Sequence, residues 1–318
     1  MMDARTDPHI SLIVPAHNEE GNITALFEQM AETFAGSGFS YQVVFVDDGS
    51  TDGTFKEMDA IASRENLPCK VTALSFSRNF GKEAAMLAGL RSATGDFCGF
   101  IDADLQQSPA DFLEMCKLLQ ANPEYDCVAA YQANRKKTLR ERLSEWFYSF
   151  FSRTSHLEVV EGASDFRVFT RAVVDALLSM PEYHRFSKGL FAWIGFKTLP
   201  YEYEPSERVR GETNWTTRGL FRYAAEGIIS FSSFPLRLSR YIGTFVSIAA
   251  IIYLIIEIVR HIVCGVDVPG FSTLVVLILF FGGLQLLFLG IMGEYLARTY
   301  IQGKNRPAYV IREHVDSE

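Results

Sequence analysis

Short apolar runs and longer amphipathic stretches alternate over the first hundred residues of the chain. The runs at residues 10–14, 41–46, 71–75 and 97–101 are rich in β-branched and aromatic residues and predict strands. The stretches at about 21–35, 54–64 and 82–93 carry apolar residues at helical spacing and predict helices. Strands that alternate with helices predict an α/β domain with a Rossmann-like, mostly parallel sheet, in which ligands bind beyond the carboxyl ends of the strands.

Two much longer apolar stretches lie near the C-terminus. Residues 241–259 are apolar except for Glu257, and residues 271–292 contain no charged side chain. Because about 20 apolar residues cross the hydrocarbon of a bilayer, these stretches predict a transmembrane hairpin. The alternative interpretation is a pair of buried core helices. Before them, residues 216–238 combine a charged face with apolar faces, which predicts an interfacial amphipathic helix or an ordinary surface helix.

The charges that flank the two stretches predict their orientation. Basic residues precede the first stretch and follow the second, namely Arg237, Arg240, Arg298, Lys304, Arg306 and Arg312. The positive-inside rule then predicts that both termini lie in the cytoplasm. The expected organisation is a cytoplasmic α/β domain at residues 1–215, the interfacial region at 216–238, two membrane helices within 239–296, and a cytoplasmic tail at 297–318.

Composition narrows the class of protein. The 318 residues carry a formal net charge of −8, which argues against a nucleic-acid-binding protein because such proteins present a dominant basic face. The 5 cysteines are odd in number and form no CxxC pair, which fits a reduced compartment. The first residues are polar and lack the apolar run of a signal peptide.

The stretch VVFVDDGSTDGT, residues 43–54, allows two interpretations. Asp48, Ser50, Asp52 and Asp59 have the spacing of ligands in a calcium-binding loop. However, a strand precedes this stretch where an EF-hand needs a helix, and its last ligand should be glutamate. We therefore expect Asp47 and Asp48 to lie at the rim of a ligand pocket at the end of a strand.

A second acidic stretch, FCGFIDADLQQSP, follows the fourth predicted strand. Asp102 and Asp104 are two residues apart, so side chains at a strand end would point the same way. Converging carboxylates repel each other unless a cation lies between them, and oxygen ligands suit Mg²⁺ or Mn²⁺. Gln106 could add a carbonyl oxygen. An acidic turn without a metal is the alternative.

Four motifs in order, SLIVPAHNEE, VDDGSTDGT, SRNFGKEAAMLAGL and DADLQ, resemble the inverting nucleotide-sugar transferases of glycosyltransferase family 2, which have the GT-A fold. The resemblance implies a pocket for a nucleoside diphosphate sugar. It implies that Pro15, Glu19 and Asp48 line the base and ribose, with Asp47 beside them. It also implies that Asp102, Asp104 and Gln106 hold a Mg²⁺ or Mn²⁺ ion on the diphosphate.

The rest of the chain resembles one branch of that family. GASDFRVFTRAVVDAL, GETNWTTRGLFRYAAEGIISFSSFPLRL and GIMGEYLARTYIQGKNRPAYVI are similar to segments of polyisoprenyl-phosphate glycosyltransferases. Closest in pattern are the bacterial bactoprenol glucosyltransferases of O-antigen modification, with dolichyl-phosphate mannose and glucose synthases more distant. The resemblance implies transfer of a hexose, glucose in first place, from a UDP-sugar to undecaprenyl phosphate. UDP-galactose, a UDP-N-acetylhexosamine, GDP-mannose or a formamido-arabinose nucleotide are the alternative donors.

Further candidate residues for binding the acceptor phosphate and for catalysis lie between residues 135 and 208. The basic stretch NRKKTLRERLSEWFY supplies Arg135, Arg140 and Arg142, whose guanidinium groups match phosphate oxygens. A solvated or lipid-facing basic helix is the alternative for each of them. The resemblance implies that Asp165 acts as base or orients the acceptor, although pairing with Arg167 or a helix N-terminus would explain it equally well. Arg208 is the candidate for stabilising the leaving diphosphate.

Two positions depart from the pattern of the family. Gln132 stands where relatives often carry a basic residue, and Asn214 replaces the usual lysine of the GxSK motif. The resemblance further implies a bacterial inner-membrane enzyme that works with a lipid-sugar flippase and a downstream transferase. Glycines in the second apolar stretch would permit close packing between helices, so a homo-oligomer is a further expectation. An inactive membrane scaffold is the alternative of another class, and the intact Asp102 and Asp104 pair argues against it.

Overall fold

The computed structural model describes residues 8–132, 163–183, 185–204, 234–264 and 270–317. The chain divides into two compact units: residues 1–149, 157–216 and 306–318 form the first, and residues 150–156 and 217–305 form the second. Arg135, Arg140, Arg142, Arg208 and Asn214, together with most of the predicted interfacial helix, lie outside the described residues.

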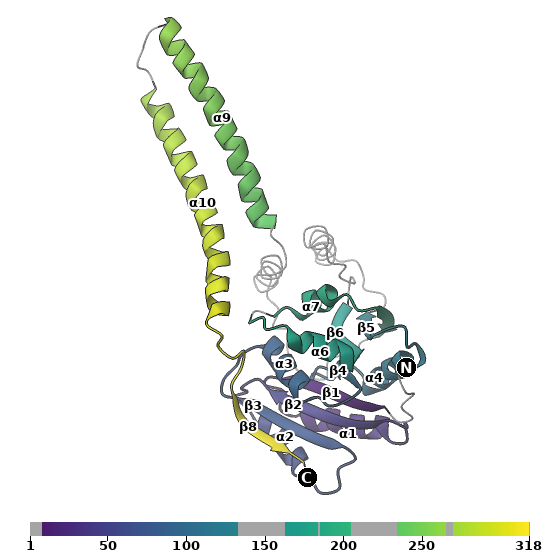
Figure 1. The fold of residues 1–318 in the computed structure, drawn as a ribbon. Helices are drawn as coiled ribbons and strands as arrows, with labels where there is room; N and C mark the ends of the chain where they lie inside the picture. The colour runs from purple at the N-terminus through teal and green to yellow at the C-terminus, as the bar shows by residue number, and fades with distance from the viewer. Residues whose placement is uncertain (1–7, 133–162, 184, 205–233, 265–269, 318) are drawn as a thin grey trace. The chain divides into compact units, whose positions relative to one another are not determined.

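The first unit contains a mixed sheet with helices on both faces (Figure 1). Its strands are β1 (His9–Ala16), β2 (Ser40–Asp47), β3 (Lys70–Phe76), β4 (Phe97–Phe100), β5 (Cys127–Gln132), β6 (Ala163–Thr170), β7 (Thr198–Tyr203) and β8 (Ile311–Asp316). They lie in the order β7-β5-β6-β4-β1-β2-β3-β8. Strands β4, β1, β2 and β3 are parallel, whereas β6 and β8 run antiparallel to β4 and β3 at either side of this block.

The helices of this unit are α1 (Ile23–Phe34), α2 (Thr54–Ala62), α3 (Lys82–Ser92), α4 (Pro109–Ala121), α6 (Arg171–Ser179) and α7 (Ser187–Ile194). Side chains alternate between the two faces of each strand. In β1, Leu12 and Val14 belong to the buried cluster with α1, α2 and α4. Ile13 points to the other face, where a side chain added at Gly89 of α3 would collide with it. The central strand is therefore buried on both faces, as expected for a parallel block.

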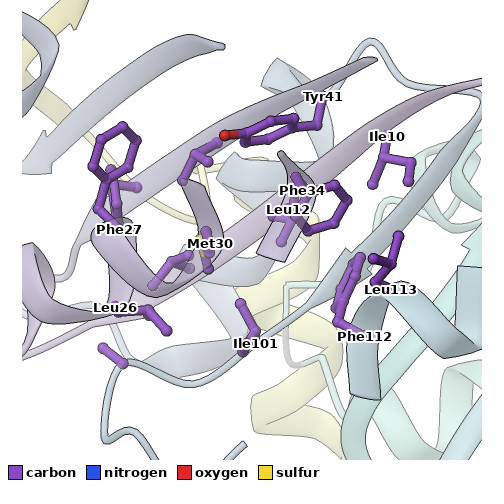
Figure 2. Close-up of a cluster of buried hydrophobic side chains, with 14 of the residues drawn as sticks. Ile10, Leu12, Leu26, Phe27, Met30, Phe34, Tyr41, Ile101, Phe112 and Leu113 are labelled. Atoms are coloured by element: carbon purple, nitrogen blue, oxygen red, sulfur yellow. The ribbon is translucent and has the colours of Figure 1, made fainter. Parts of the chain in front are cut away.

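The core on the first of these faces is large and aromatic. Figure 2 shows part of this cluster, which includes Phe27, Met30 and Phe34 of α1, Leu12 of β1 and Phe112 of α4. Each of these side chains has at most 3% of its surface exposed. Such burial stabilises each large apolar side chain by about 1.5–3 kcal/mol, which makes this part of the sheet a firm support for the loops at its edge.

The predicted strands and helices of the first hundred residues are confirmed within two residues at each end. The predicted tail at residues 297–318 contains a strand that was not expected from the sequence. Ile311–Asp316 forms β8, which pairs antiparallel with β3 and contributes an edge strand to the sheet (Figure 1). Its sequence, IREHVD, alternates only weakly, so pattern alone gives little sign of a strand.

The second unit contains the two longest helices, α9 (Phe234–Cys264) and α10 (Phe271–Gly303), which contact each other. By length and composition, both are able to cross a membrane, with candidate spans at Phe234–Tyr253 and Phe280–Gly303. Large apolar side chains are exposed along both helices, such as Phe245, Ile262 and Leu286, at 74%, 76% and 70%. Water would disfavour this much exposed apolar surface, whereas lipid would not.

Candidate active site

The candidate site lies at the carboxyl edge of the parallel block. Because β4, β1, β2 and β3 are parallel neighbours, the loops that follow them emerge at the same edge. These loops carry the four motifs singled out in the sequence. The order of strands reverses direction around β1, and such a switch point is where open α/β sheets bind ligands.

Strand β6 brings Asp165 to this edge. It runs antiparallel to β4, with Arg167 opposite Phe100. Asp165 lies two residues before Arg167 on β6, and Asp102 lies two residues after the end of β4, so the antiparallel pairing carries both acids to the same edge. Two residues that are separated by more than sixty positions in the chain are thereby brought to one place by strand pairing.

Lys82, at the start of α3, lies between these two acids. Its Nζ atom is 2.6 Å from Asp102 Oδ1 and 3.3 Å from Asp165 Oδ2. The helix is held at this point by Glu83, which accepts hydrogen bonds from the backbone N–H and the hydroxyl of Ser187 at the start of α7. A lysine of the chain therefore stands between Asp102 and Asp165, a different pair from the Asp102 and Asp104 expected to hold a divalent cation.

The charges of this cluster shift its pKa values. Burial by itself would lower the pKa of Lys82, but the carboxylates of Asp102 and Asp165 outweigh it and raise that pKa above its ordinary value. Burial would raise the pKa of Asp165, yet the positive charges of Lys82, Lys188 and Arg167 hold it below its ordinary value. Lys82 is therefore protonated and Asp165 ionised at neutral pH.

Asp102 and Asp104 lie in a turn rather than on the strand. Strand β4 ends at Phe100, so the alternation of strand side chains does not set the direction of either acid, contrary to the expectation from sequence. The turn is shaped by Leu105, whose φ of 61° is in the left-handed region. The backbone N–H of Gln106 donates to Asp104 Oδ1 at 3.2 Å.

Gln107 holds Asp102 in place. Its Oε1 atom accepts the Asp102 backbone N–H at 2.8 Å, and its Nε2 atom donates to Asp102 Oδ2 at 3.1 Å. The side chain of Gln107 is buried, with 7% of its surface exposed. The described contacts of Gln106 with the acids involve its backbone, so its role as a metal ligand stays a prediction.

The donor set at this turn fits a divalent cation of the Mg²⁺ class. Asp102 and Asp104 offer carboxylate oxygens, which hard cations prefer. Within the described residues, no group of three or more His, Cys, Asp or Glu side chains could hold a metal ion. That is compatible with Mg²⁺, which is usually bound through one or two carboxylates together with substrate phosphates.

Asp47 and Asp48 accept hydrogen bonds from neighbouring segments of the chain, including strand β3. The Oδ1 and Oδ2 atoms of Asp47 accept hydrogen bonds from the Ser50 N–H at 2.9 Å and the Ser75 hydroxyl at 2.7 Å. The carboxylate of Asp48 accepts the N–H groups of Phe80 and Gly81 in the loop before α3. Burial raises the pKa of Asp48, and these two N–H groups offset part of the rise.

The loops after β1 and β2 are joined to each other. The Glu19 N–H donates to the Thr54 hydroxyl at 2.8 Å, and the Asn18 amide oxygen accepts the Thr51 N–H at 2.9 Å. Asp52 accepts the Thr54 N–H and hydroxyl at the start of α2. This contact gives the Asp52 carboxylate partners in the chain itself, at the first residue of α2, without calcium. Pro15 lies buried within β1 opposite Val46.

Lys82 and Gln107 are two site residues whose roles were not predicted from the sequence. Lys82 stands in the quoted motif SRNFGKEAAMLAGL, and Gln107 is adjacent to the candidate ligand Gln106. A lysine that follows a glycine at a helix start was the available signal for Lys82. The sequence offered no signal for Gln107, because only the conformation of the turn shows which of the two adjacent glutamines contacts Asp102 with its side chain.

Comparison with known proteins shows the family of the chain. Residues 11–178 match the model of the family described as glycosyl transferase family 2. A prophage bactoprenol glucosyl transferase homolog of Escherichia coli (strain K12) is 40% identical over 305 residues, which cover 95% of this chain and 98% of that protein. The SfII prophage-derived bactoprenol glucosyl transferase of Shigella flexneri is 39% identical over 306 residues, which cover 96% and 97%.

A glucosyl-3-phosphoglycerate synthase of M. tuberculosis is similar in structure, with a TM-score of 0.48 and 18% sequence identity over 71% of this chain and 80% of that one. The mixed sheet, its helical layers and the acidic turn after β4 define an enzyme of the glycosyltransferase class with a GT-A fold. The chain belongs to glycosyltransferase family 2.

Proposed function

We propose that this enzyme transfers a hexose, glucose in first place, from a UDP-sugar to undecaprenyl phosphate with inversion at the anomeric carbon. The relatives named as bactoprenol glucosyl transferases support the acceptor and the sugar, because they match this chain over nearly its whole length. The exposed apolar helices α9 and α10 support a lipid acceptor, since an enzyme held in the membrane meets a lipid phosphate at the bilayer surface.

The reaction requires little proton transfer. An oxygen of the acceptor phosphate attacks the anomeric carbon, a new carbon–oxygen bond forms, and the bond to the diphosphate breaks with its electron pair leaving on UDP. The second pKa of a phosphate monoester is about 6, so the nucleophile is already mostly dianionic at neutral pH. A general base adds little to such a nucleophile.

This chemistry favours an electrostatic role for Asp165. Its pKa is held below the ordinary value by Lys82 and its other cationic neighbours, which makes it a weak base. We infer that Asp165 and Asp102 together hold the Lys82 ammonium at the site where the charge of the leaving diphosphate develops. Such a preorganised cation stabilises the transition state.

Asp102 and Asp104, with Gln106 as a further oxygen donor, would hold Mg²⁺ or Mn²⁺. Bound there, the ion would supply additional positive charge for the diphosphate. Gln107 would support this by fixing the Asp102 carboxylate. Pro15, Glu19, Asp47 and Asp48 remain the candidates for the nucleotide pocket, and Arg135, Arg140, Arg142 and Arg208 remain candidates for phosphate contacts.

In the cell, we propose that α9 and α10 cross the bacterial inner membrane and that the catalytic domain and both termini face the cytoplasm. The product would then be a lipid-linked monosaccharide on the cytoplasmic side. A flippase and a second transferase would be required for its use in a glycan on the opposite side.

The observation that carries this proposal is the cluster of Asp102, Lys82 and Asp165 at the carboxyl edge of the sheet. The test uses the full chain, purified in detergent, with undecaprenyl phosphate, Mg²⁺ or Mn²⁺, and a panel of UDP-hexoses and GDP-mannose. Release of the nucleotide and formation of the glycolipid are measured together. We expect the largest turnover with UDP-glucose.

A matched pair of variants makes the test specific. Asp104→Asn should reduce turnover by about 10³-fold, because it removes charge that binds the cation. Asp59→Asn makes the same change at an exposed acid of α2 and should leave turnover unaltered. If no donor of the panel yields a glycolipid, the proposal is wrong. If a donor other than UDP-glucose gives the largest turnover, the acceptor class stands and the sugar is corrected.

A further inference from the structure

The C-terminal strand β8 is irregular where it runs beside the end of β3. Glu313 lies opposite Ser75, and the next pair is Ile311 with Phe76, which leaves Arg312 as an extra residue on β8. An extra residue of this kind is a β-bulge, and bulges often redirect a side chain. Here the side chain of Arg312 turns onto the hydroxyl of Ser75.

A chain of hydrogen bonds runs from this arginine to Asp47. Arg312 Nη2 lies 3.2 Å from Ser75 Oγ, and Ser75 Oγ lies 2.7 Å from Asp47 Oδ2. Ser75 and Asp47 are fully buried. A serine hydroxyl has one proton, and the guanidinium group is only a donor. Because Arg312 donates to the Ser75 oxygen, the Ser75 hydroxyl proton is directed to Asp47, and the hydrogen bond from Ser75 to Asp47 has a fixed direction.

A second line of contacts leads from the same segment to Asp48. The ring of Tyr309 stacks on Phe76, with centroids 4.9 Å apart and planes at 11°. Phe76 in turn meets the edge of Phe80, with centroids at 5.8 Å. The Phe80 N–H donates to Asp48 Oδ1 at 2.6 Å. The Tyr309 hydroxyl is itself held by Arg91 of α3, at 3.1 Å.

We propose that the segment Tyr309–Asp316 positions the donor pocket, with Arg312 acting through Ser75 on Asp47 and Tyr309 acting through Phe76 and Phe80 on Asp48. The proposal rests on the proposed function, in which both acids border the nucleotide. The chain that follows α10 is then required for tight binding of the nucleotide as well as for closing the edge of the sheet.

The test compares Arg312→Ala, Arg312→Lys and the control His314→Ala in the full-length protein. His314 lies on the same strand, is exposed, and pairs with Asp316 rather than with β3 side chains. The dissociation constant of UDP is measured by calorimetry. KM and kcat are measured with the preferred donor. Hydrogen exchange is measured in peptides that cover residues 48–53 and 77–81.

Arg312→Ala should weaken UDP binding and raise the donor KM by about tenfold, the effect of one lost hydrogen bond to a charged group. It should change kcat by less than about twofold and speed exchange at residues 48–53, because Asp47 holds the Ser50 N–H there. Arg312→Lys, which keeps a donor, should recover part of the loss, and His314→Ala should behave as the unaltered protein.

Each failure has a distinct signature. If the unaltered protein binds no UDP but Arg312→Ala still speeds exchange at residues 48–53, the proposed function is wrong while the positioning role holds. If UDP binding and exchange are the same in Arg312→Ala and the unaltered protein, the positioning role is wrong. A uniform rise of exchange across the whole sheet would also overturn it, since that result indicates a general loss of stability.

Discussion

The Nζ atom of Lys82 lies 2.6 Å from Oδ1 of Asp102, the first acid of the motif expected to bind a divalent cation. A second contact, at 3.3 Å, joins the same ammonium to Asp165. A lysine of the chain therefore contacts a carboxylate that the expected cation would also use. The positive charge at the site would then have a fixed part, supplied by Lys82 of α3, and a part supplied by the cation when it is bound.

Replacing Lys82 should reduce catalysis strongly. Lys82→Met keeps the length of the side chain but removes its charge, and we expect turnover to fall by about 10²-fold or more. Lys56→Met, at an exposed lysine of α2, is the matched control. Turnover is measured as release of UDP at saturating donor and acceptor. Turnover of Lys82→Met within a few-fold of the control would remove Lys82 from the mechanism.

Replacing Gln107 should weaken metal binding. Gln107→Ala releases the Asp102 carboxylate, and loss of such a supporting contact typically lowers metal affinity by about 10–100-fold. Binding of Mn²⁺ in the presence of UDP is measured by electron paramagnetic resonance. Gln106→Ala, measured beside it, tests whether Gln106 is a ligand. Unchanged Mn²⁺ affinity in Gln107→Ala would contradict the supporting role.

The loop after β2 should not tolerate a side chain at Gly49. This residue has a φ of 65°, and an added Cβ atom would lie 2.3 Å from the backbone carbon of Arg78. Gly49→Ala should lower the free energy of unfolding by about 3 kcal/mol or more, from backbone strain and overpacking together.

Gly36→Ala separates these two causes. Gly36 also has a positive φ, of 71°, but an added Cβ atom there meets nothing within 4 Å. Gly36→Ala should therefore lower the free energy of unfolding by the backbone strain alone, about 1–2 kcal/mol. Chemical denaturation of both variants measures the difference. Equal losses would show that the close approach of the two loops adds no cost.

Glu83 should make stability depend on pH. Burial raises its pKa above the ordinary 4.5, while the Ser187 hydrogen bonds offset part of the rise. The folded state therefore holds this proton more tightly than the unfolded state, so its contribution is fully present below about pH 4.5 and is lost as pH rises through the folded pKa.

Glu83→Gln removes this titration. The variant should lose less stability than the unaltered protein as pH rises above about 4.5, the ordinary pKa, because the folded-state pKa of Glu83 lies above that value. Thermal midpoints across this range measure the effect, with Glu28→Gln at an exposed acid of α1 as control. Parallel pH profiles for Glu83→Gln and the unaltered protein would contradict the prediction.

The sequence by itself determined the elements of the parallel block. Apolar runs such as residues 41–46 can be buried on both faces only in a central strand, and the helices between them carry their own spacing signal. The acidic motifs could also be recognised, because they occur in order with two further motifs in the pattern of glycosyltransferase family 2. Their approximate position at the carboxyl edge followed from the direction of parallel strands.

Only the tertiary structure decided which groups meet at that edge. Lys82 reaches Asp165 because β6 runs antiparallel to β4, and Arg312 reaches Ser75 because a bulge in β8 turns its side chain. Both relationships depend on pairing between strands that are distant in the chain. The periodicity of a single strand indicates which face is buried, but it does not predict which strand lies beside it or in what register the two strands pair.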